Sequence, residues 1–211
     1  MSFKNATHEK VIYIFRHGET DWNKVGRMQG GTDILLNETG RIQAQSLRRF
    51  FAQNPVEVFL CSDFKRAVET ANIASGDLHV PFVLEQRLRE TNLGLAEGLT
   101  ADEINSRFGA GTMDRWRKSG TQEMGFSFPN GETKAQHLER NLRALEEFLQ
   151  STRYRTIGVA SHGGAMRRLI HHFQAGFEGT VFVGNCVVYR VLYDVESGDF
   201  DLETKPVFEP F

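Results

Sequence analysis

Residues 11–23, VIYIFRHGETDWN, join an apolar run to an abruptly polar turn. The β-branched and aromatic residues of the run predict a buried strand, and His17 follows directly where the strand ends. Residues 156–164, TIGVASHGG, repeat the arrangement and place His162 after a second short apolar strand. Ligands of an open α/β sheet bind beyond the carboxyl ends of its strands, so we expect the two histidines to meet at one site.

The chain has 211 residues, of which 40% are hydrophobic, and this is enough for one sizeable core. Since no linker-like stretch divides it, we expect a single globular domain over residues 1–211. The formal net charge is -2, and the short, scattered basic clusters do not form the basic face typical of a nucleic-acid-binding protein. We therefore expect no nucleic-acid partner, and any anionic ligand should be small.

No window of the sequence has the length and apolar composition of a membrane span, and the polar first residues do not resemble a signal peptide. We therefore expect a soluble protein without a membrane partner, with the cytoplasm as its default location. Cys61 and Cys186 lack metal-like spacing, and we expect two buried thiols rather than a disulfide.

Helical and strand patterns alternate along the rest of the chain, which predicts an α/β fold with a largely parallel sheet. Asn37 or Thr39 can cap the first long helix, Ser62 and Asp63 the second, and Thr100 the third, with a capping box. We expect helices over residues 39–53, 64–74, 100–108, 133–151 and 164–173. Strands are expected over 56–61 and 80–84, and the proline of the second indicates an edge position or a strand start. The last element is expected to be a hairpin of residues 187–194 and 199–205.

Two segments with little periodicity are candidates for the walls of a site. Residues 109–131 contain glycines, Trp116, Phe126 and Phe128, and we interpret them as a lid or side wall within an insertion that spans 91–131. Residues 24–36 form a glycine-bearing loop that is too long for a tight strand-to-helix turn, and loops of this kind often carry function.

Arg16 and Arg66 are predicted to lie at the same sheet edge as the histidines. A surface ion pair is the usual role of an arginine, but a guanidinium fork also fits the oxygens of a phosphoryl group closely. The helix that begins after Gly163 adds backbone N–H donors and a dipole that favours an anion. Together these groups indicate a phosphate pocket.

Glu90 lies in a charged loop between two apolar anchors. It is either a solvated loop carboxylate or a general acid that protonates a leaving oxygen, and its position alone does not choose between them. His17, His162 and Glu90 could also hold a zinc ion, but two arginines beside a cation argue against it, as does the absence of any His-x-x-x-His or Cys-x-x-Cys spacing. The glycine-rich segments match neither a P-loop nor a dinucleotide-binding pattern.

The turn at residues 16–23, RHGETDWN, resembles the signature of the histidine phosphatase superfamily, the phosphoglycerate mutase-like proteins. Further segments are similar to other motifs of that family, in the family's order, so the resemblance covers nearly the whole chain. These segments are GRMQG (26–30), SDFKRAVETA (62–71), LRETNLGLAEG (88–98), PNGE (129–132) and SHGG (161–164). The resemblance implies a three-layer α/β sandwich with helices on both faces of a mostly parallel sheet.

The resemblance also implies a role for each matching residue. His17 would be the nucleophile that forms a phosphohistidine, and Glu90 would donate the proton to the leaving group. No metal or organic cofactor would be needed for hydrolysis. The residues implied to clamp the phosphoryl oxygens are Arg16, Asn23, Arg66, His162 and the amide of Gly163, with Gln29 and Gly30 at the mouth of the pocket.

Departures from the mutase pattern favour a phosphatase. Glycolytic mutases hold the substrate carboxylate with a tyrosine and a lysine, where this chain has Leu93 and Ala101, although residues 116–118, WRK, are similar to the mutases' Trp-Arg-Arg. We therefore expect a phosphatase for a small phosphorylated metabolite. A phosphoglycerate mutase-type transferase and a non-catalytic relative that binds phosphorylated ligands are the alternatives. The oligomeric state, monomer or homodimer, stays open.

Overall fold

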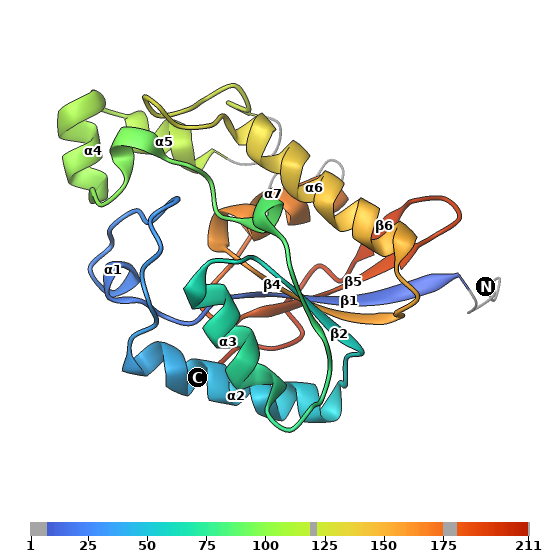
Figure 1. Cartoon of the computed structure of the whole chain (residues 1–211). Helices are drawn as coiled ribbons and strands as arrows, with labels where there is room; N and C mark the ends of the chain where they lie inside the picture. The colour runs from blue at the N-terminus through green and yellow to red at the C-terminus, as the bar shows by residue number, and fades with distance from the viewer. Residues whose placement is uncertain (1–7, 119–121, 175–180, 211) are drawn as a thin grey trace.

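A six-stranded sheet with the strand order β3-β2-β4-β1-β5-β6 forms the centre of the computed structural model, which describes residues 8–118, 122–174 and 181–210 (Figure 1). Strands β1, β4, β2 and β3 run parallel, and β5 and β6 are antiparallel to their neighbours. The strands are β1 (Glu9–Arg16), β2 (Val58–Cys61), β3 (Phe82–Leu84), β4 (Thr156–Ser161), β5 (Val188–Asp194) and β6 (Phe200–Leu202). The predicted parallel sheet, its edge strand and the final hairpin are confirmed.

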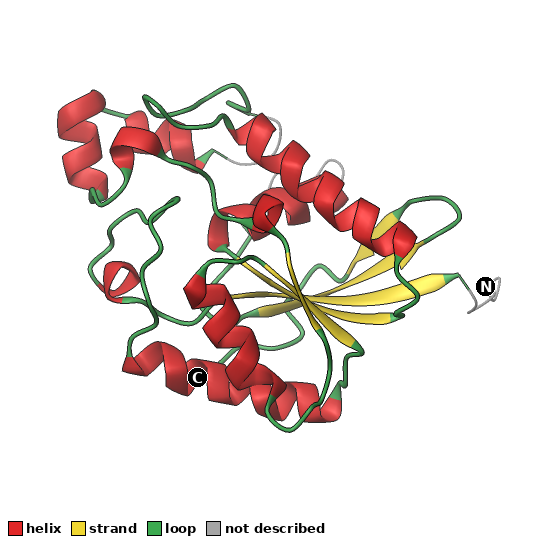
Figure 2. Ribbon diagram, viewed as in Figure 1, coloured by secondary structure: helices red, strands yellow, loops and turns green. Residues whose placement is uncertain are grey.

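Helices cover both faces of the sheet, as expected of a three-layer sandwich (Figure 2). The side chains of β1 alternate between the faces: Ile12 and Ile14 join the core beneath α6 and α7, whereas Tyr13 and Phe15 join the core beneath α2 and α3. The helices are α2 (Glu38–Gln53) and α3 (Lys65–Ser75) on one face, and α6 (Lys134–Ser151) and α7 (Gly163–Phe173) on the other.

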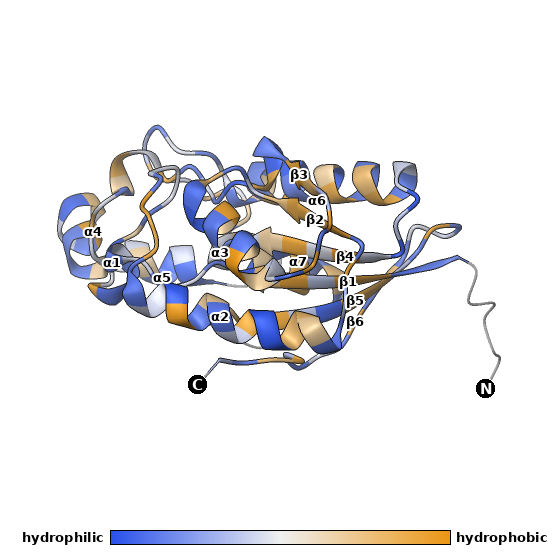
Figure 3. Cartoon of the chain, turned by 60° about the horizontal axis from the view of Figure 1, so that its bottom comes forward, coloured by the Kyte–Doolittle hydropathy of each residue, from blue (hydrophilic) through white to orange (hydrophobic). Residues whose placement is uncertain are grey.

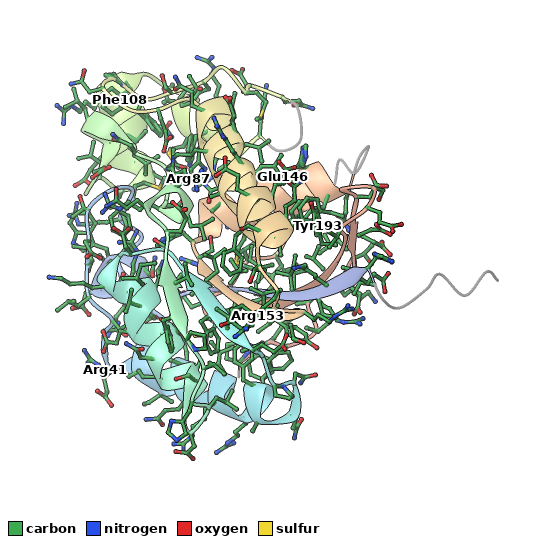
Figure 4. The ribbon with its side chains drawn as sticks, turned by 45° about the vertical axis from the view of Figure 1, so that its right-hand side comes forward. Arg41, Arg87, Phe108, Glu146, Arg153 and Tyr193 are labelled. Atoms are coloured by element: carbon green, nitrogen blue, oxygen red, sulfur yellow. The ribbon has the colours of Figure 1, made fainter. Side chains whose placement is uncertain are left out.

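The long helices are amphipathic, so α2 and α6 carry both hydrophobic and hydrophilic residues in Figure 3. Tyr193 of β5 is fully buried beside α6, and its hydroxyl group accepts a hydrogen bond of 3.3 Å from Gln150 (Figure 4). Among the described residues, no helix is long and apolar enough to cross a membrane. Cys61 and Cys186 are buried free thiols, as predicted.

Several capping predictions are confirmed, and one is wrong. The Asn37 side chain caps α2, and Thr100 forms a capping box with Glu103 at the start of α4 (Ala101–Phe108). The N-cap of α3 is instead Phe64, with no side-chain hydrogen bond. The two predicted caps have other partners, since Asp63 forms a salt bridge of 2.6 Å with Arg89 and Ser62 contacts His162.

The segment interpreted as a lid has its own hydrophobic core. It contains the short helix η2 (Gly94–Ala96), α4 and α5 (Thr112–Arg117). The six-residue α5 was not predicted, because it follows Gly109 and Gly111 and is too short to show a period. Residues 119–121 of this segment lie outside the described residues. The buried side chains of this lid core are Leu93, Ala96, Ile104, Met113, Phe126 and Phe128.

A close approach of two glycines fixes the turn that follows β1. A Cβ atom added to Gly18 would lie 2.4 Å from the carbonyl oxygen of Gly40, and one added to Gly40 would lie 2.1 Å from the carbonyl oxygen of Glu19. Both distances are far shorter than a van der Waals contact, so neither position has room for a side chain. The first turn of α2 therefore packs directly on the backbone beside His17. The turn is therefore braced by α2 as well as by the sheet.

We predict that Gly40→Ala lowers the free energy of unfolding by about 1–3 kcal/mol, because the added methyl group forces the Glu19 backbone to move. Urea unfolding followed by circular dichroism measures the change. Gly125→Ala is the matched control, since a Cβ atom there meets nothing within 4 Å. Equal losses of stability in the two variants would contradict this close packing.

Candidate active site

The two histidines lie side by side where β1 and β4 end. Arg16 pairs with Ser161 in the parallel register, so the next residues, His17 and His162, leave the sheet together. Their ring centroids are 5.3 Å apart, and both side chains are buried, with exposed fractions of 3% and 0%. The prediction that these two histidines meet at the carboxyl ends of their strands is confirmed.

His17 is held as one neutral tautomer. Its Nδ1 atom lies 2.7 Å from the carbonyl oxygen of Gly18, and a carbonyl only accepts hydrogen bonds, so Nδ1 carries the proton. The Nε2 atom therefore carries a lone pair. Burial, followed by the positive charges of Arg66 and Arg16, holds the pKa of His17 well below its ordinary value. A neutral imidazole with a free Nε2 lone pair is the form that can act as a nucleophile.

Thr70 of α3 supports this turn and was not predicted. The amide of Gly18 donates a hydrogen bond of 3.0 Å to the Thr70 hydroxyl, which donates in turn to the carbonyl oxygen of Arg66 at 2.6 Å. The backbone beside His17 is thus tied to the helix that carries Arg66. The contact bridges residues 52 positions apart, a distance over which local sequence patterns give no signal.

Arg66 is fully buried, and the loop that precedes α2 orients its guanidinium group. Its two Nη atoms donate to the carbonyl oxygens of Thr32 at 2.8 Å and Gly30 at 3.1 Å, and Asp33 lies 3.6 Å away. Arg16 donates from Nη1 to the carbonyl oxygen of Val183 at 3.0 Å. Burial lowers the pKa of each arginine to about 10, so both stay cationic at neutral pH.

Three polar atoms around His17 are buried and have no hydrogen-bond partner among the described residues: Arg16 Nε, Arg66 Nε and His162 Nδ1. The other ring nitrogen of His162 lies 2.8 Å from the Ser62 hydroxyl. A serine hydroxyl can either donate to that nitrogen or accept from it, so this contact is compatible with both neutral tautomers of His162. Buried polar groups normally have partners, and the two unpartnered guanidinium N–H groups are donors of the kind that binds the oxygens of an anion.

Glu90 contacts the first turn of α7. Its Oε2 atom accepts a hydrogen bond of 2.8 Å from the amide of Gly164, and its Oε1 atom accepts one of 2.9 Å from the amide of Thr91. A Cβ atom at position 164 would lie 2.4 Å from Glu90 Oε1, so a larger residue there would displace the Glu90 carboxylate. Burial favours the protonated form, but the Gly164 amide, the charge of Arg168 and the Thr91 amide act in the opposite direction and hold the pKa of Glu90 below its ordinary value.

The remaining predicted residues surround this centre. Asn23 accepts at Oδ1 from the Thr20 amide and from the side chain of Asn185, which also donates to the carbonyl oxygen of His17 at 3.0 Å. Gly163 lies against the Arg16 guanidinium, since a Cβ atom there would be 3.3 Å from Nε. Asn185 is a further residue that the sequence did not indicate.

The two residues predicted at the mouth differ in what they contribute. Gly30 supplies the carbonyl oxygen that orients Arg66, as described above. Gln29 is buried, and within the described part of the chain its Oε1 atom has no hydrogen-bond partner. The apolar residues Leu93, Phe126 and Phe128 pack into the lid core, whereas Leu95 is exposed.

Two buried histidines thus lie beside Arg16 and the buried Arg66, where the parallel strands β1 and β4 end. The model of the histidine phosphatase superfamily (branch 1) matches residues 12–203, and the chain therefore belongs to this superfamily.

The relatives of known sequence include both phosphatases and mutases. The chain is 29% identical to the uncharacterized phosphatase PhoE of Bacillus subtilis, with 84% of this chain and 86% of the relative covered. It is 31% identical to the probable phosphoglycerate mutase GpmB of Photorhabdus laumondii, with 86% and 84% covered. The chain is thus similar to enzymes of both kinds.

Solved structures agree with this assignment. A mycobacterial glucosyl-3-phosphoglycerate phosphatase, solved in complex with VO3, superimposes with a TM-score of 0.81 at 26% identity, covering 92% of this chain and 98% of the other. YhfR of Bacillus stearothermophilus also gives a TM-score of 0.81, at 27% identity over 92% and 96% of the two chains.

We predict that Glu90→Gln destabilises the protein at neutral pH by about 1–3 kcal/mol, because two buried amides lose a charged acceptor. The pKa of Glu90 is lowered from its ordinary value of 4.5 to about 2. Its ionised form therefore stabilises the fold above about pH 4.5, and this contribution is lost as the pH falls toward 2.

Urea unfolding of wild type and Glu90→Gln at several pH values tests this prediction. The stability gap should be largest at pH 5 and above and should narrow in more acidic buffer. Glu139→Gln, at an exposed position of α6, is the control. A gap that does not change with pH would show that the Glu90 carboxylate does not stabilise the fold through its charge.

Proposed function

We propose that this protein is a phosphatase that hydrolyses a small phosphomonoester through a phosphohistidine intermediate on His17. The observation that carries the proposal is the neutral His17 tautomer, whose Nε2 lone pair is combined with two buried arginine Nε–H donors that have no partner among the described residues. A nucleophile and an anion-binding pocket are thereby combined at one point of the fold.

In the first step, His17 Nε2 attacks the phosphorus atom and the bond to the ester oxygen breaks. Arg16, Arg66 and His162 stabilise the charge on the phosphoryl oxygens, with Asn23 and the Gly163 amide as further donors. Glu90 donates its proton to the leaving oxygen. In the second step, water attacks the phosphorus atom, Glu90 takes a proton from it, and the P–N bond breaks to release phosphate. Neither step requires a metal ion or an organic cofactor.

The proton on Glu90 has a source in the substrate. The pKa of Glu90 is about 2 while positively charged groups surround it. A bound phosphoryl group brings negative charge next to the carboxylate, and this raises the pKa of Glu90. A phosphomonoester monoanion carries one proton, since its second pKa is about 6. The bound monoanion can therefore pass this proton to Glu90 before the leaving group departs.

Two features favour a phosphatase over a mutase. Leu93 is buried in the lid core and Ala101 packs against it, so neither presents a polar group to a substrate carboxylate. The related sequence PhoE and the mycobacterial glucosyl-3-phosphoglycerate phosphatase are named as phosphatases. A phosphoglycerate mutase is the second candidate, because the chain is 31% identical to a probable mutase.

Phosphate release tests the proposal. We expect release from at least one member of a panel of sugar phosphates, phosphoglycerates, nucleotides and p-nitrophenyl phosphate, with EDTA present. Rapid quenching with 32P-labelled substrate should trap an acid-labile, base-stable label on the wild-type protein, as a P–N bond requires. His17→Ala should show neither the label nor turnover.

The same panel contains the opposing outcome. If no phosphate is released and phosphoglycerates interconvert once a bisphosphorylated primer is added, the protein is a mutase. A labelled His17→Ala variant would mean that another residue is the nucleophile.

The role of Glu90 makes a separate prediction. Glu90→Gln should lower kcat for an alkyl phosphate by about 10²-fold or more, because the poor leaving group needs a proton. For p-nitrophenyl phosphate, whose leaving group is stable as an anion, the loss should be far smaller. Steady-state kinetics with both substrates measure the difference, and equal losses would exclude Glu90 as the general acid.

A further inference from the structure

A buried polar cluster lies behind Glu90, on the side facing α6 and α7. It consists of Thr91, His137 and Arg168, and the side chains of Thr91 and His137 are fully buried. The reaction proposed above uses none of these three residues. His137 occupies the inward face of α6 together with Ala144 and Leu145, where an apolar residue would satisfy the packing. Packing alone therefore does not account for a polar cluster at this position.

Arg168 determines the protonation state of His137. The Nη1 atom of Arg168 lies 2.9 Å from His137 Nδ1 and can only donate, so Nδ1 must be the acceptor. His137 is then neutral, with its proton on Nε2, and Nε2 donates to the carbonyl oxygen of Arg89 at 3.2 Å. A second proton cannot bind at Nδ1 unless Arg168 moves away. Burial, followed by the charge of Arg168, accordingly holds the pKa of His137 well below its ordinary value.

Arg168 also contacts the hydroxyl group of Thr91. Arg168 Nη1 lies 3.2 Å from Thr91 Oγ1, and the single hydroxyl proton of Thr91 can reach Glu90 Oε1 at 3.3 Å or His137 Nδ1 at 3.1 Å. Arg168 Nη1 also lies 2.9 Å from the carbonyl oxygen of Gly164, and the Gly164 amide donates to Glu90 Oε2. Both oxygens of the Glu90 carboxylate therefore contact residues, Thr91 and Gly164, that Arg168 also contacts.

The charged groups around Glu90 and His137 come from several elements. His137 Nε2 lies 3.8 Å from Glu90 Oε1, and Arg140 of α6 donates to the carbonyl oxygens of Arg89 and Glu90 and pairs with Glu132. Arg16, at the end of β1, and Arg66, in the first turn of α3, also interact electrostatically with Glu90. Because His137 is neutral, Arg168 supplies the permanent positive charge on this side of Glu90.

The lid covers Arg168. Its guanidinium carbon lies 4.8 Å from the centre of the Trp116 ring, and Trp116 packs against Phe126 and Phe128. A flat cation stacked on an indole ring is stabilised by the ring's electron density, more strongly where water is excluded. Lys134 holds α5 in place by donating to the carbonyl oxygens of Arg115 at 2.9 Å and Lys118 at 3.0 Å.

We infer that Arg168 is a positioning residue for Glu90: it locks His137 as the neutral Nε2–H tautomer and orients Thr91, so that the charge beside the general acid does not change with pH near neutrality. The inference rests on the proposed function, because it concerns the acid of that reaction. A histidine free to titrate at this position would change its charge between about pH 5 and 8.

Histidine titration by NMR tests the inference without relying on catalysis. The chain has seven histidines. His137 should not titrate between about pH 5 and 8 in the wild type, and it should titrate in that range in Arg168→Met. The double variant Arg168→Met/His137→Gln assigns the signal by removing it. Arg168→Lys keeps a donor and should keep His137 neutral, and Arg143→Met, which removes an exposed arginine of α6, is the charge control.

Kinetics provide the second readout. In Arg168→Met, the pH profile of kcat for an alkyl phosphate should acquire an additional ionisation between about pH 5 and 8 that wild type, Arg168→Lys and the double variant lack. A purely structural role would lower kcat by the same factor at every pH. An unchanged profile in Arg168→Met would overturn the inference.

The outcomes separate this inference from the proposed function. A wild-type His137 that titrates near neutral pH overturns the inference even if Arg168→Met fails to fold, because the tautomer argument then fails in the native protein. Equal losses of Glu90→Gln on good and poor leaving groups overturn the acid role of Glu90 instead. That result leaves the NMR titration of His137 unaffected.

Discussion

The parallel pairing of β1 with β4 is the constraint on which the rest of the site depends. It sets Arg16 opposite Ser161, so the two histidines that follow leave the sheet together with their rings 5.3 Å apart. A slip of one residue would turn one histidine to the other face. The register is fixed by the alternation of β1, whose Ile12 and Phe15 are buried on opposite faces of the sheet.

This geometry buries the positive charges of Arg16 and Arg66 at the end of the sheet. Two guanidinium groups and two histidines surround one point, and burying an uncompensated charge is costly. The structure offsets the cost with backbone carbonyl oxygens, those of Gly30 and Thr32 for Arg66 and that of Val183 for Arg16. Carbonyl groups accept hydrogen bonds without neutralising the charge. The Asp33 carboxylate, 3.6 Å from Arg66, offsets part of this charge, and the carbonyl groups stabilise the rest without cancelling its attraction for an anion.

The sequence predicted the sheet, the long helices and the meeting of His17 with His162, because each of these has a local pattern. The apolar runs before His17 and His162 mark strands, and the leucines of α6 mark a helix. Contacts between distant segments had no such pattern. Thr70, Asn185 and Arg168 each have at least one hydrogen-bond partner more than 50 positions away along the chain.

The one wrong cap had the same cause. Ser62 and Asp63 are good capping residues next to a helix, but Asp63 binds Arg89, and the Ser62 hydroxyl, which contacts His162 at 2.8 Å, reaches only the Phe64 amide, at 3.4 Å. Tertiary partners that the local sequence does not contain decided the outcome at that position. Helix α5 was missed for a different reason, since six residues are fewer than two turns and cannot establish a period.

The separate core of the lid has a consequence for how such a protein can change over evolutionary time. The buried lid residues, such as Ile104 and Phe128, form a cluster apart from the two clusters that pack on the sheet. Substitutions inside this cluster therefore change mainly the packing of the lid and leave the two clusters on the sheet intact. A lineage can vary the interior of the lid while it inherits the sheet end that carries His17, and Trp116, which lies over Arg168, is the point where the two parts are linked.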